Sequence, residues 1–309
     1  MYRTSVSDSE GSHIRNSLLG GVRRDGRGLL EHRVPLVTPG VVPHTDGSCS
    51  VDIGGTHVLV NLVVSVAETA SGQGELRVHL DCAPSVISSY AQTLGGADNR
   101  YRKTFVSWLS NTVSKVFGAE VVAAEEQGLA EAILDDELES ESEERNQNRD
   151  FPSHALAIGN GYSFVIDADV QISECMGGNV VGATAMCISS ALKTVKLPHV
   201  TLHETPNGIS VEVDKSRSFS GVVDWSVLPT VVVAHWTAST FLVDATFSEE
   251  ASIPRFLVVA STQSGRVSHW MLQCFPSKQG IQSLGLSPVD LRSLIGDSLL
   301  VCDQLRESH

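Results

Sequence analysis

The segment YSFVIDADVQISECMGGNVVGATAMCISSAL, residues 162–192, decides the fold. Residues 162–172 alternate between apolar and polar side chains, which predicts a strand with one apolar face. Gly177, Gly178 and Asn179 then predict a tight turn, with Asn179 suited to cap the start of a helix. The helix that follows has a face of small side chains, which lets another backbone approach closely. The sequence therefore predicts a strand, a turn and a helix that pack on one another.

The same segment has the parts of a chemical site. Asp167 and Asp169 lie on the polar face of the predicted strand, and the N–H groups at the start of the helix attract anions. Carboxylates beside a helix N-terminus can build an anion or metal site. A core strand packed on a core helix would show the same spacing, and spacing alone favours this simpler interpretation.

The charge of the chain is strongly negative but unevenly spread. Its 309 residues suffice for one large domain or two lobes, and 41% hydrophobic residues can bury a core. The formal net charge is −14, of which residues 125–150 contribute −9. Because the remainder carries only −5, local basic clusters can still serve a nucleic-acid partner.

Several classes of site and protein are not expected. Met1–Ser5 are followed by no apolar stretch, and no apolar run reaches the roughly 18 residues of a membrane span, so neither a signal peptide nor a membrane partner is expected. The six cysteines form no C-x-x-C pair and predict buried free thiols in a reducing compartment. The 11 histidines lack zinc-binding spacing. We therefore expect no metal and no cofactor.

Hydrophobic periodicity predicts further strands and helices along the chain. Strands are predicted at residues 34–37, 48–53, 56–66, 75–83, 231–235, 240–243, 256–260 and 266–270. Helices are predicted at residues 98–117 and 287–305. Each half thus consists of antiparallel strands with helices packed on them, which predicts a mixed α/β (α+β) fold with two lobes.

The predicted domain organisation places the lobes at residues 15–200 and 201–309. Residues 1–14 are mostly polar and predict a disordered N-terminus. Residues 124–150 interrupt the first lobe with acidic, low-complexity sequence. This segment has too few apolar side chains to offset its ordering entropy, so we expect a flexible insertion there.

A first basic cluster surrounds an Asp-Gly turn near the N-terminus. Its members are Arg23, Arg24 and Arg27, with Asp25 between them. Contact with phosphate is one interpretation, and a surface turn held by Arg–Asp pairs is the other. The sequence leaves both open.

A second basic cluster, Arg100, Arg102 and Lys103, lies in the first turns of the predicted helix 98–117. It is the densest short group of positive charge in the middle of the chain. A solvated helix face is the usual structure for such a group, whereas a helix start also favours an anion.

Six motifs occur in an order that resembles the RNase PH family. They are RRDGR at 23–27, DGSCSVDIGGTHVLV at 46–60, HLDCAPS at 79–85, FVIDADV at 164–170, GGNVVGATA at 177–185 and VDATFSEEA at 243–251. Each motif alone is weak, but six in this order span nearly the whole chain. The resemblance implies a ribosomal-protein-S5-like arrangement of two lobes with mixed sheets and packed helices.

Active members of that family degrade RNA from the 3′ end with phosphate as the nucleophile, which needs a cationic cradle and carboxylates. The resemblance implies an arginine before the strand, an acid on it and an acid directly before Gly-Gly. Here Asp169 is retained, but Tyr162 and Met176 stand at the other two positions. Gly182 stands where the inactive branch usually has an acid, and Leu94 where many relatives have a Gly-Arg pair.

Within the family, the chain most resembles RNase PH-like subunits of the eukaryotic RNA exosome ring that lack their own active site. The resemblance implies a structural, RNA-guiding subunit in 3′–5′ RNA degradation and processing, including rRNA processing, with no catalytic residues. Its implied partners are other RNase PH-like ring subunits, RNA-binding cap subunits and single-stranded RNA. Its implied location is the nucleus, nucleolus and cytoplasm. Arg100, Arg102 and Lys103 are the candidate RNA-binding residues.

Two alternatives remain open. One is an active phosphate-dependent 3′–5′ exoribonuclease that uses Asp169 and Glu174 in an altered geometry. The other is a scaffold of the same fold that binds no RNA, which would require the second basic cluster to face away from any channel.

Overall fold

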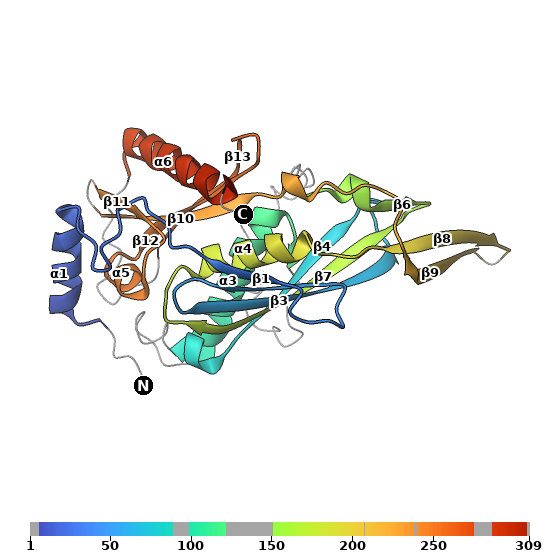
Figure 1. Ribbon diagram of the computed structural model, residues 1–309, viewed down its shortest axis with the longest axis horizontal. Coiled ribbons are helices and arrows are strands. Elements are labelled where there is room, and N and C mark those ends of the chain that lie inside the picture. Colours follow the sequence, from blue (N-terminus) through green and yellow to red (C-terminus); the bar gives the residue numbers. More distant parts are fainter. Residues whose placement is uncertain are drawn as a thin grey trace, which may run out of the picture.

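The computed structural model describes residues 6–88, 99–121, 151–206, 208–237, 240–274 and 286–307. Two sheets form the body of the molecule, and the helix α4 (Val180–Leu192) packs against both of them (Figure 1). A two-stranded ribbon projects from one end of the body, and the helix α1 (Asp8–Leu19) lies at the other (Figure 1). The expected mixed α/β architecture is confirmed.

The larger sheet has seven strands in the order β1-β2-β3-β7-β4-β5, with β6 paired to β7. These strands are β1 (Leu36–Pro39), β2 (Gly47–Asp52), β3 (Thr56–Glu68), β4 (Glu75–Cys82), β5 (Glu120–Val121), β6 (Ala157–Gly159) and β7 (Tyr162–Cys175). The central strand β7 runs antiparallel to β3 and parallel to β4. The interpretation of each half as antiparallel strands was therefore wrong for β4 and β7, whereas the mixed sheets that the family resemblance implied are confirmed. The helix α3 (Asn99–Phe117) lies between β4 and β5 in the chain, and such a crossover permits parallel pairing.

The smaller sheet has four strands in the order β11-β10-β12-β13. They are β10 (Thr230–Thr237), β11 (Thr240–Val243), β12 (Arg255–Ser261) and β13 (Val267–Cys274). The helix α5 (Phe247–Ser252) connects β11 to β12, and α6 (Pro288–Glu307) packs over β10 and β12 (Figure 1). The sequence predicted these four strands and the last helix, but it did not predict α5.

One hydrophobic core joins the two sheets through α4. The alternating residues of β7 that face it include Phe164, Ile166 and Val170, each at most 1% exposed. Val231 and Phe256 of the smaller sheet belong to the same buried cluster. The predicted division of the lobes at residues 200 and 201 falls inside β8, which spans Pro198–Thr205.

The N-terminal segment is helical where the sequence predicted disorder for residues 1–14. From residue 8 onward that prediction was wrong, while Met1–Ser5 lie outside the described residues. Ser7 caps α1 by accepting a hydrogen bond from the Glu10 amide at 3.2 Å. Ile14 and Leu18, one helical turn apart, are buried in a small cluster against Leu242 and Ile253. Tertiary contacts thus stabilise a short helix that its own apolar content would not.

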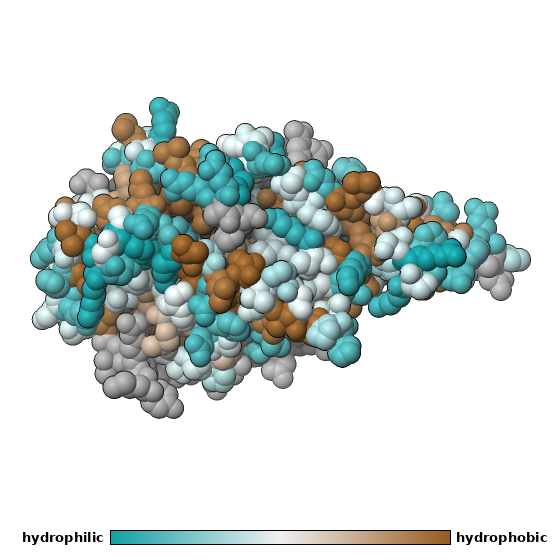
Figure 2. All heavy atoms as spheres, viewed as in Figure 1, coloured by the Kyte–Doolittle hydropathy of each residue, from teal (hydrophilic) through white to brown (hydrophobic). Residues whose placement is uncertain are grey.

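The projecting ribbon pairs β8 with β9 (Gly208–Ser218) and was not predicted. Val200 lies opposite Val213, and Leu202 lies opposite Val211, so these four apolar side chains share one face. The face of the ribbon turned to the viewer in Figure 2 is mostly hydrophilic.

Five cysteines are free and buried, as expected: Cys49, Cys82, Cys175, Cys187 and Cys302. No helix in the described part of the chain has both the length and the apolar character needed to cross a membrane. The predicted acidic insertion at 124–150 and Leu94 lie outside the described residues.

Candidate functional site

The turn between β7 and α4 is shaped by close backbone contacts. A Cβ on Gly177 would lie 2.5 Å from the Ile53 carbonyl oxygen, and one on Gly178 would lie 2.6 Å from the Phe247 nitrogen. Gly178 has φ of 76° and Asn179 has φ of 54°, both in the left-handed region. The turn is therefore held between the β2–β3 turn and the start of α5, and only glycine fits at these two close approaches.

Asn179 connects the start of α4 to the smaller sheet. Its backbone N–H donates to Glu250 Oε1 at 2.7 Å, and its side-chain amide donates to Asp244 Oδ1 at 2.7 Å. It occupies the predicted N-cap position, but its side chain makes no capping hydrogen bond. A Cβ on Gly182 would lie 2.5 Å from Asn179 Oδ1. The Asn179 side chain therefore fills the space that a side chain at position 182 would need.

Asp244 is the centre of this buried network, with a fully buried side chain. Arg33 donates to both carboxylate oxygens, to Oδ1 at 2.6 Å and to Oδ2 at 2.7 Å, and Arg27 donates to Oδ2 at 2.8 Å. Burial opposes ionisation of Asp244, but the hydrogen bonds and charge of Arg33, with a contribution from His32, outweigh it and hold the pKa of Asp244 well below its usual value. Asp244 is thus a charged, structurally paired carboxylate.

Arg23 forms a second buried ion pair. Its guanidinium donates to Glu249 Oε1 at 3.0 Å and to Oε2 at 2.7 Å, and both residues are at most 3% exposed. Glu249 Oε2 also accepts from the Thr246 amide at 2.8 Å and closes a capping box on α5. The first basic cluster is therefore held by acids: Arg27 also pairs with Asp25 at 2.7 Å. The interpretation of Arg–Asp pairing is confirmed, but Arg23 is buried and not on the surface.

The start of α4 is already supplied with negative charge by the chain itself. The Glu250 carboxylate bonds to the first free N–H group, where an external anion would otherwise lie. Arg33 also lies at this turn, where it donates to Asp244 and to the Gly177 carbonyl oxygen at 2.8 Å. The arrangement stabilises the packing of the two sheets, and among the described residues the Arg33 guanidinium is held by the chain's own acceptors.

Behind this cluster lies His235, which is fully enclosed. Its Nδ1 is 2.9 Å from the Ile253 carbonyl oxygen, and its Nε2 is 4.0 Å from Glu250 Oε1. Burial lowers the pKa of His235 to about 4. The imidazole is therefore neutral at physiological pH and donates Nδ1–H to Ile253.

Asp169 lies on the exposed face of β7, opposite Asn61 of β3 and His79 of β4. Asp167 lies on the same face, with Oδ1 3.6 Å from His79 Nε2. These polar groups lie on the side of the sheet away from α4, because the alternate residues of β7 face the core.

Glu174 is exposed and lies opposite His57, next to a bulge in the β3–β7 pairing. It lies five positions after Asp169, which corresponds to about 16 Å along a strand. The structure therefore does not bring these two carboxylates onto one ion. Met176, 40% exposed, stands directly before Gly177.

The candidate RNA-binding residues Arg100, Arg102 and Lys103 lie in the first turns of α3. Their side chains lie outside the described part of the structure, so their role stays a prediction. Among the described residues, no group of three or more His, Cys, Asp or Glu side chains could hold a metal ion.

Sequence reasoning missed Arg33 and the pairing of Asp244 and Glu250 with the start of α4. The motif at 243–251 contains the three acids of this network, Asp244, Glu249 and Glu250, and it was the one indication of them in the sequence. The partners of Asp244 and Glu250 at the start of α4 lie 65 or more positions away in the chain, and Asp244 lies 211 positions from Arg33. No local pattern reveals such a pairing.

A mixed sheet whose central strand leads through a Gly-Gly turn into a buried helix defines an RNase PH-like α/β protein. A model of the RNase PH 3′ exoribonuclease family, domain 1, matches residues 31–198. The chain belongs to this family.

Relatives and solved structures agree with this assignment. The chain is 26% identical over 243 residues to the exosome complex component Rrp42 of Pyrobaculum aerophilum, covering 78% of this chain and 74% of that protein. The Rrp42 protein of Thermococcus gammatolerans is 23% identical over 258 residues, covering 82% and 80%.

Among solved structures, an archaeal exosome core chain superposes with a TM-score of 0.66 at 17% identity, covering 97% of this chain and 96% of that one. An Archaeoglobus fulgidus exosome with RNA bound to the active site gives a TM-score of 0.65 at 17% identity, covering 97% of each chain. These matches establish the fold over nearly the whole length of the chain.

Proposed function

We propose that this chain is a non-catalytic, structural and RNA-guiding subunit of an exosome-type ring that degrades and processes RNA from the 3′ end. The similarity to archaeal Rrp42 proteins and to exosome core chains supports this role. Its partners are other RNase PH-like ring subunits, RNA-binding cap subunits and single-stranded RNA. The nucleus, nucleolus and cytoplasm are the proposed locations.

One observation carries the proposal that the subunit is inactive. The Glu250 carboxylate accepts the Asn179 N–H at 2.7 Å, so the start of α4 holds an acid of the chain itself. A phosphate nucleophile would have to displace this carboxylate, whose residue is only 5% exposed. The exposed Met176 also supplies no acid directly before the Gly-Gly turn.

Three measurements test the proposal. The tagged full-length chain is purified from its source cells, and size-exclusion chromatography with mass spectrometry identifies what elutes with it. We expect a ring-sized complex that contains other RNase PH-like subunits. Elution without any such subunit would refute the assignment to a ring.

The second measurement tests catalysis. The purified full-length chain is incubated with a 3′-labelled oligoribonucleotide, Mg²⁺ and phosphate, and nucleoside diphosphates are quantified. We expect no release above that of the Asp169→Asn variant. Phosphate-dependent release that disappears in Asp169→Asn would instead support the active exoribonuclease, for which the exposed Asp169 carboxylate on β7 is the favouring observation.

RNA guiding is tested in the assembled complex. Ultraviolet crosslinking to a single-stranded oligoribonucleotide should label this subunit. A complete complex in which neighbouring subunits crosslink and this one does not would favour the scaffold that binds no RNA.

A further inference from the structure

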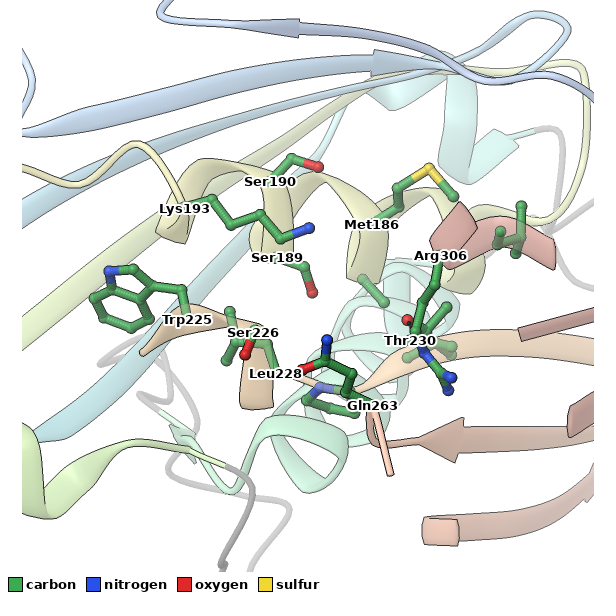
Figure 3. A pocket seen from close by; sticks show the side chains of 14 residues that line it. Met186, Ser189, Ser190, Lys193, Trp225, Ser226, Leu228, Thr230, Gln263 and Arg306 are labelled. Atoms are coloured by element: carbon green, nitrogen blue, oxygen red, sulfur yellow. Dashed lines mark hydrogen bonds between the residues drawn. The ribbon is translucent and has the colours of Figure 1, made fainter. Parts of the chain in front are cut away.

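A pocket of about 190 Å³ lies at the other end of α4, between the two sheets (Figure 3). The last two turns of α4, the segment from Trp225 to Val231, Gln263 and the end of α6 surround it. The residues of α4 that line it run from Ala185 to Lys193, so the pocket begins about 10 Å along the helix from the Gly-Gly turn. It is therefore separate from the site described above.

The floor of this pocket is apolar. Leu228 and Val231 lie there, each 6% exposed, together with Ala185 and Leu305. The half-buried indole of Trp225 forms one wall (Figure 3). Such a floor suits an apolar or planar body of limited size.

The rim of the pocket is polar and carries donors. Figure 3 shows the amine of Lys193, the hydroxyl of Ser189 and the amide of Gln263 pointing into the same space. Within the described part of the chain, no hydrogen bond or ion pair engages the Lys193 amine or the Gln263 amide. These groups are therefore available to a ligand.

Arg306 lines the pocket but is committed elsewhere. It donates to Thr230 Oγ1 at 3.2 Å and to Ser261 Oγ at 2.6 Å, and it pairs with Asp303 at 2.5 Å. No carboxylate is found among the described residues that line the pocket. Lys193 thus supplies an uncompensated positive charge on a chain whose net charge is −14.

Lys193 also follows the C-terminal end of α4, where a cation is favourable without any ligand. Stabilisation of the helix end accounts for the charge of Lys193. It does not account for the apolar floor, the Gln263 amide and the Ser189 hydroxyl, which surround the same pocket. The combination matches a compact ligand with an anionic group, a polar edge and an apolar face.

We propose that this pocket binds a mononucleotide, with the phosphate at Lys193. A lysine binds phosphate as a point charge, and serine and glutamine can pair with the polar edge of a base. The base and sugar would lie on the apolar floor beside Trp225. The choice of a nucleotide over other small organic phosphates rests on the proposed role in RNA degradation. The existence of the pocket and the contact between Lys193 and a phosphate do not depend on that role.

Isothermal titration of the full-length chain with UMP and AMP tests this site. We expect saturable binding, with Lys193→Met weakening it at least tenfold and Lys193→Arg largely retaining it. Lys196→Met is the matched control, because Lys196 is an exposed lysine three residues further on that does not line the pocket. It should leave the affinity unchanged, and Gln263→Ala should weaken it several-fold.

Uridine and inorganic phosphate separate the two parts of the ligand. Uridine binding as tightly as UMP would overturn the phosphate contact, and inorganic phosphate binding as tightly as UMP would overturn the nucleotide. Equal losses in Lys193→Met and Lys196→Met would indicate general charge attraction and refute the pocket. Ring assembly and crosslinking should be unaffected by Lys193→Met, so failure of this site and failure of the proposed function are read separately.

Discussion

The two ends of α4 use charge in opposite ways. At its N-terminal end, the carboxylates of Asp244 and Glu250 are buried and hydrogen-bonded to Arg33 and Asn179. At its C-terminal end, Lys193 is exposed beside an apolar pocket. Buried charges without partners are costly, so those at the first end pair with one another and fix the fold. The charge of Lys193 at the second end remains available to the phosphate of a bound ligand.

The largest expected effect comes from removing the charge at the centre of the buried network. Asp244→Asn keeps the shape of the side chain but removes the anion that pairs with Arg33 and leaves Arg27 with Asp25 alone. We expect the free energy of unfolding, measured by urea denaturation, to fall by about 3–5 kcal/mol. Glu212→Gln on the exposed ribbon is the control and should change it by less than about 0.5 kcal/mol. A loss below about 1 kcal/mol in Asp244→Asn would show that this end of α4 does not depend on the network.

Protonation of His235, which lies near the N-terminal end of α4, should lower the free energy of unfolding at acidic pH. Its pKa is lowered to about 4 in the folded state from 6.5, so the unfolded chain takes up a proton first. The stability that neutral His235 contributes is complete above about pH 6.5 and falls as the pH drops toward 4, by about 3 kcal/mol.

Thermal unfolding of the wild type and of His235→Gln between pH 7.5 and 4 measures this contribution. The glutamine amide can still donate to the Ile253 carbonyl oxygen but does not titrate. We expect a flatter pH dependence in the variant over this range. Identical slopes in the two proteins would mean that His235 is not the titrating group.

Two glycines with nearly the same φ allow the cost of backbone strain to be measured separately from the cost of steric crowding. Gly178 has φ of 76° and its Cβ would meet the Phe247 nitrogen at 2.6 Å, whereas Gly265 has φ of 74° and open space around it. Gly265→Ala should cost about 1 kcal/mol of unfolding free energy from strain alone. Gly178→Ala should cost about 2 kcal/mol more, because the backbone of the α5 start must shift. Equal losses would show that the turn is not held against α5.

The smallest effect on stability is expected at the other end of α4. Lys193→Met removes an exposed charge, so the free energy of unfolding should change by less than about 0.5 kcal/mol. Urea denaturation in parallel with Asp244→Asn provides the comparison. A loss of 2 kcal/mol or more would place Lys193 in the structural framework and remove the contrast between the two ends.

The sequence by itself determined the elements at the centre of the fold. Alternation over 162–172 predicted β7, and the small face after Gly177-Gly178 predicted α4, because both signals are local and repeat with the period of the backbone. The exposure of Asp169 followed from the same alternation. The order of the six motifs along the chain also indicated the RNase PH family.

Only the tertiary structure decided how distant residues meet. The pairing of Arg33 with Asp244 spans 211 residues, and the parallel pairing of β4 with β7 joins two strands that α3, β5 and β6 separate in the chain. The helix α1 is stabilised because two of its own side chains, Ile14 and Leu18, pack against Leu242 and Ile253. The pocket beside Lys193 is assembled from four separate segments. Such contacts depend on packing between elements that are far apart in the chain, and local sequence patterns do not encode which of them will be neighbours.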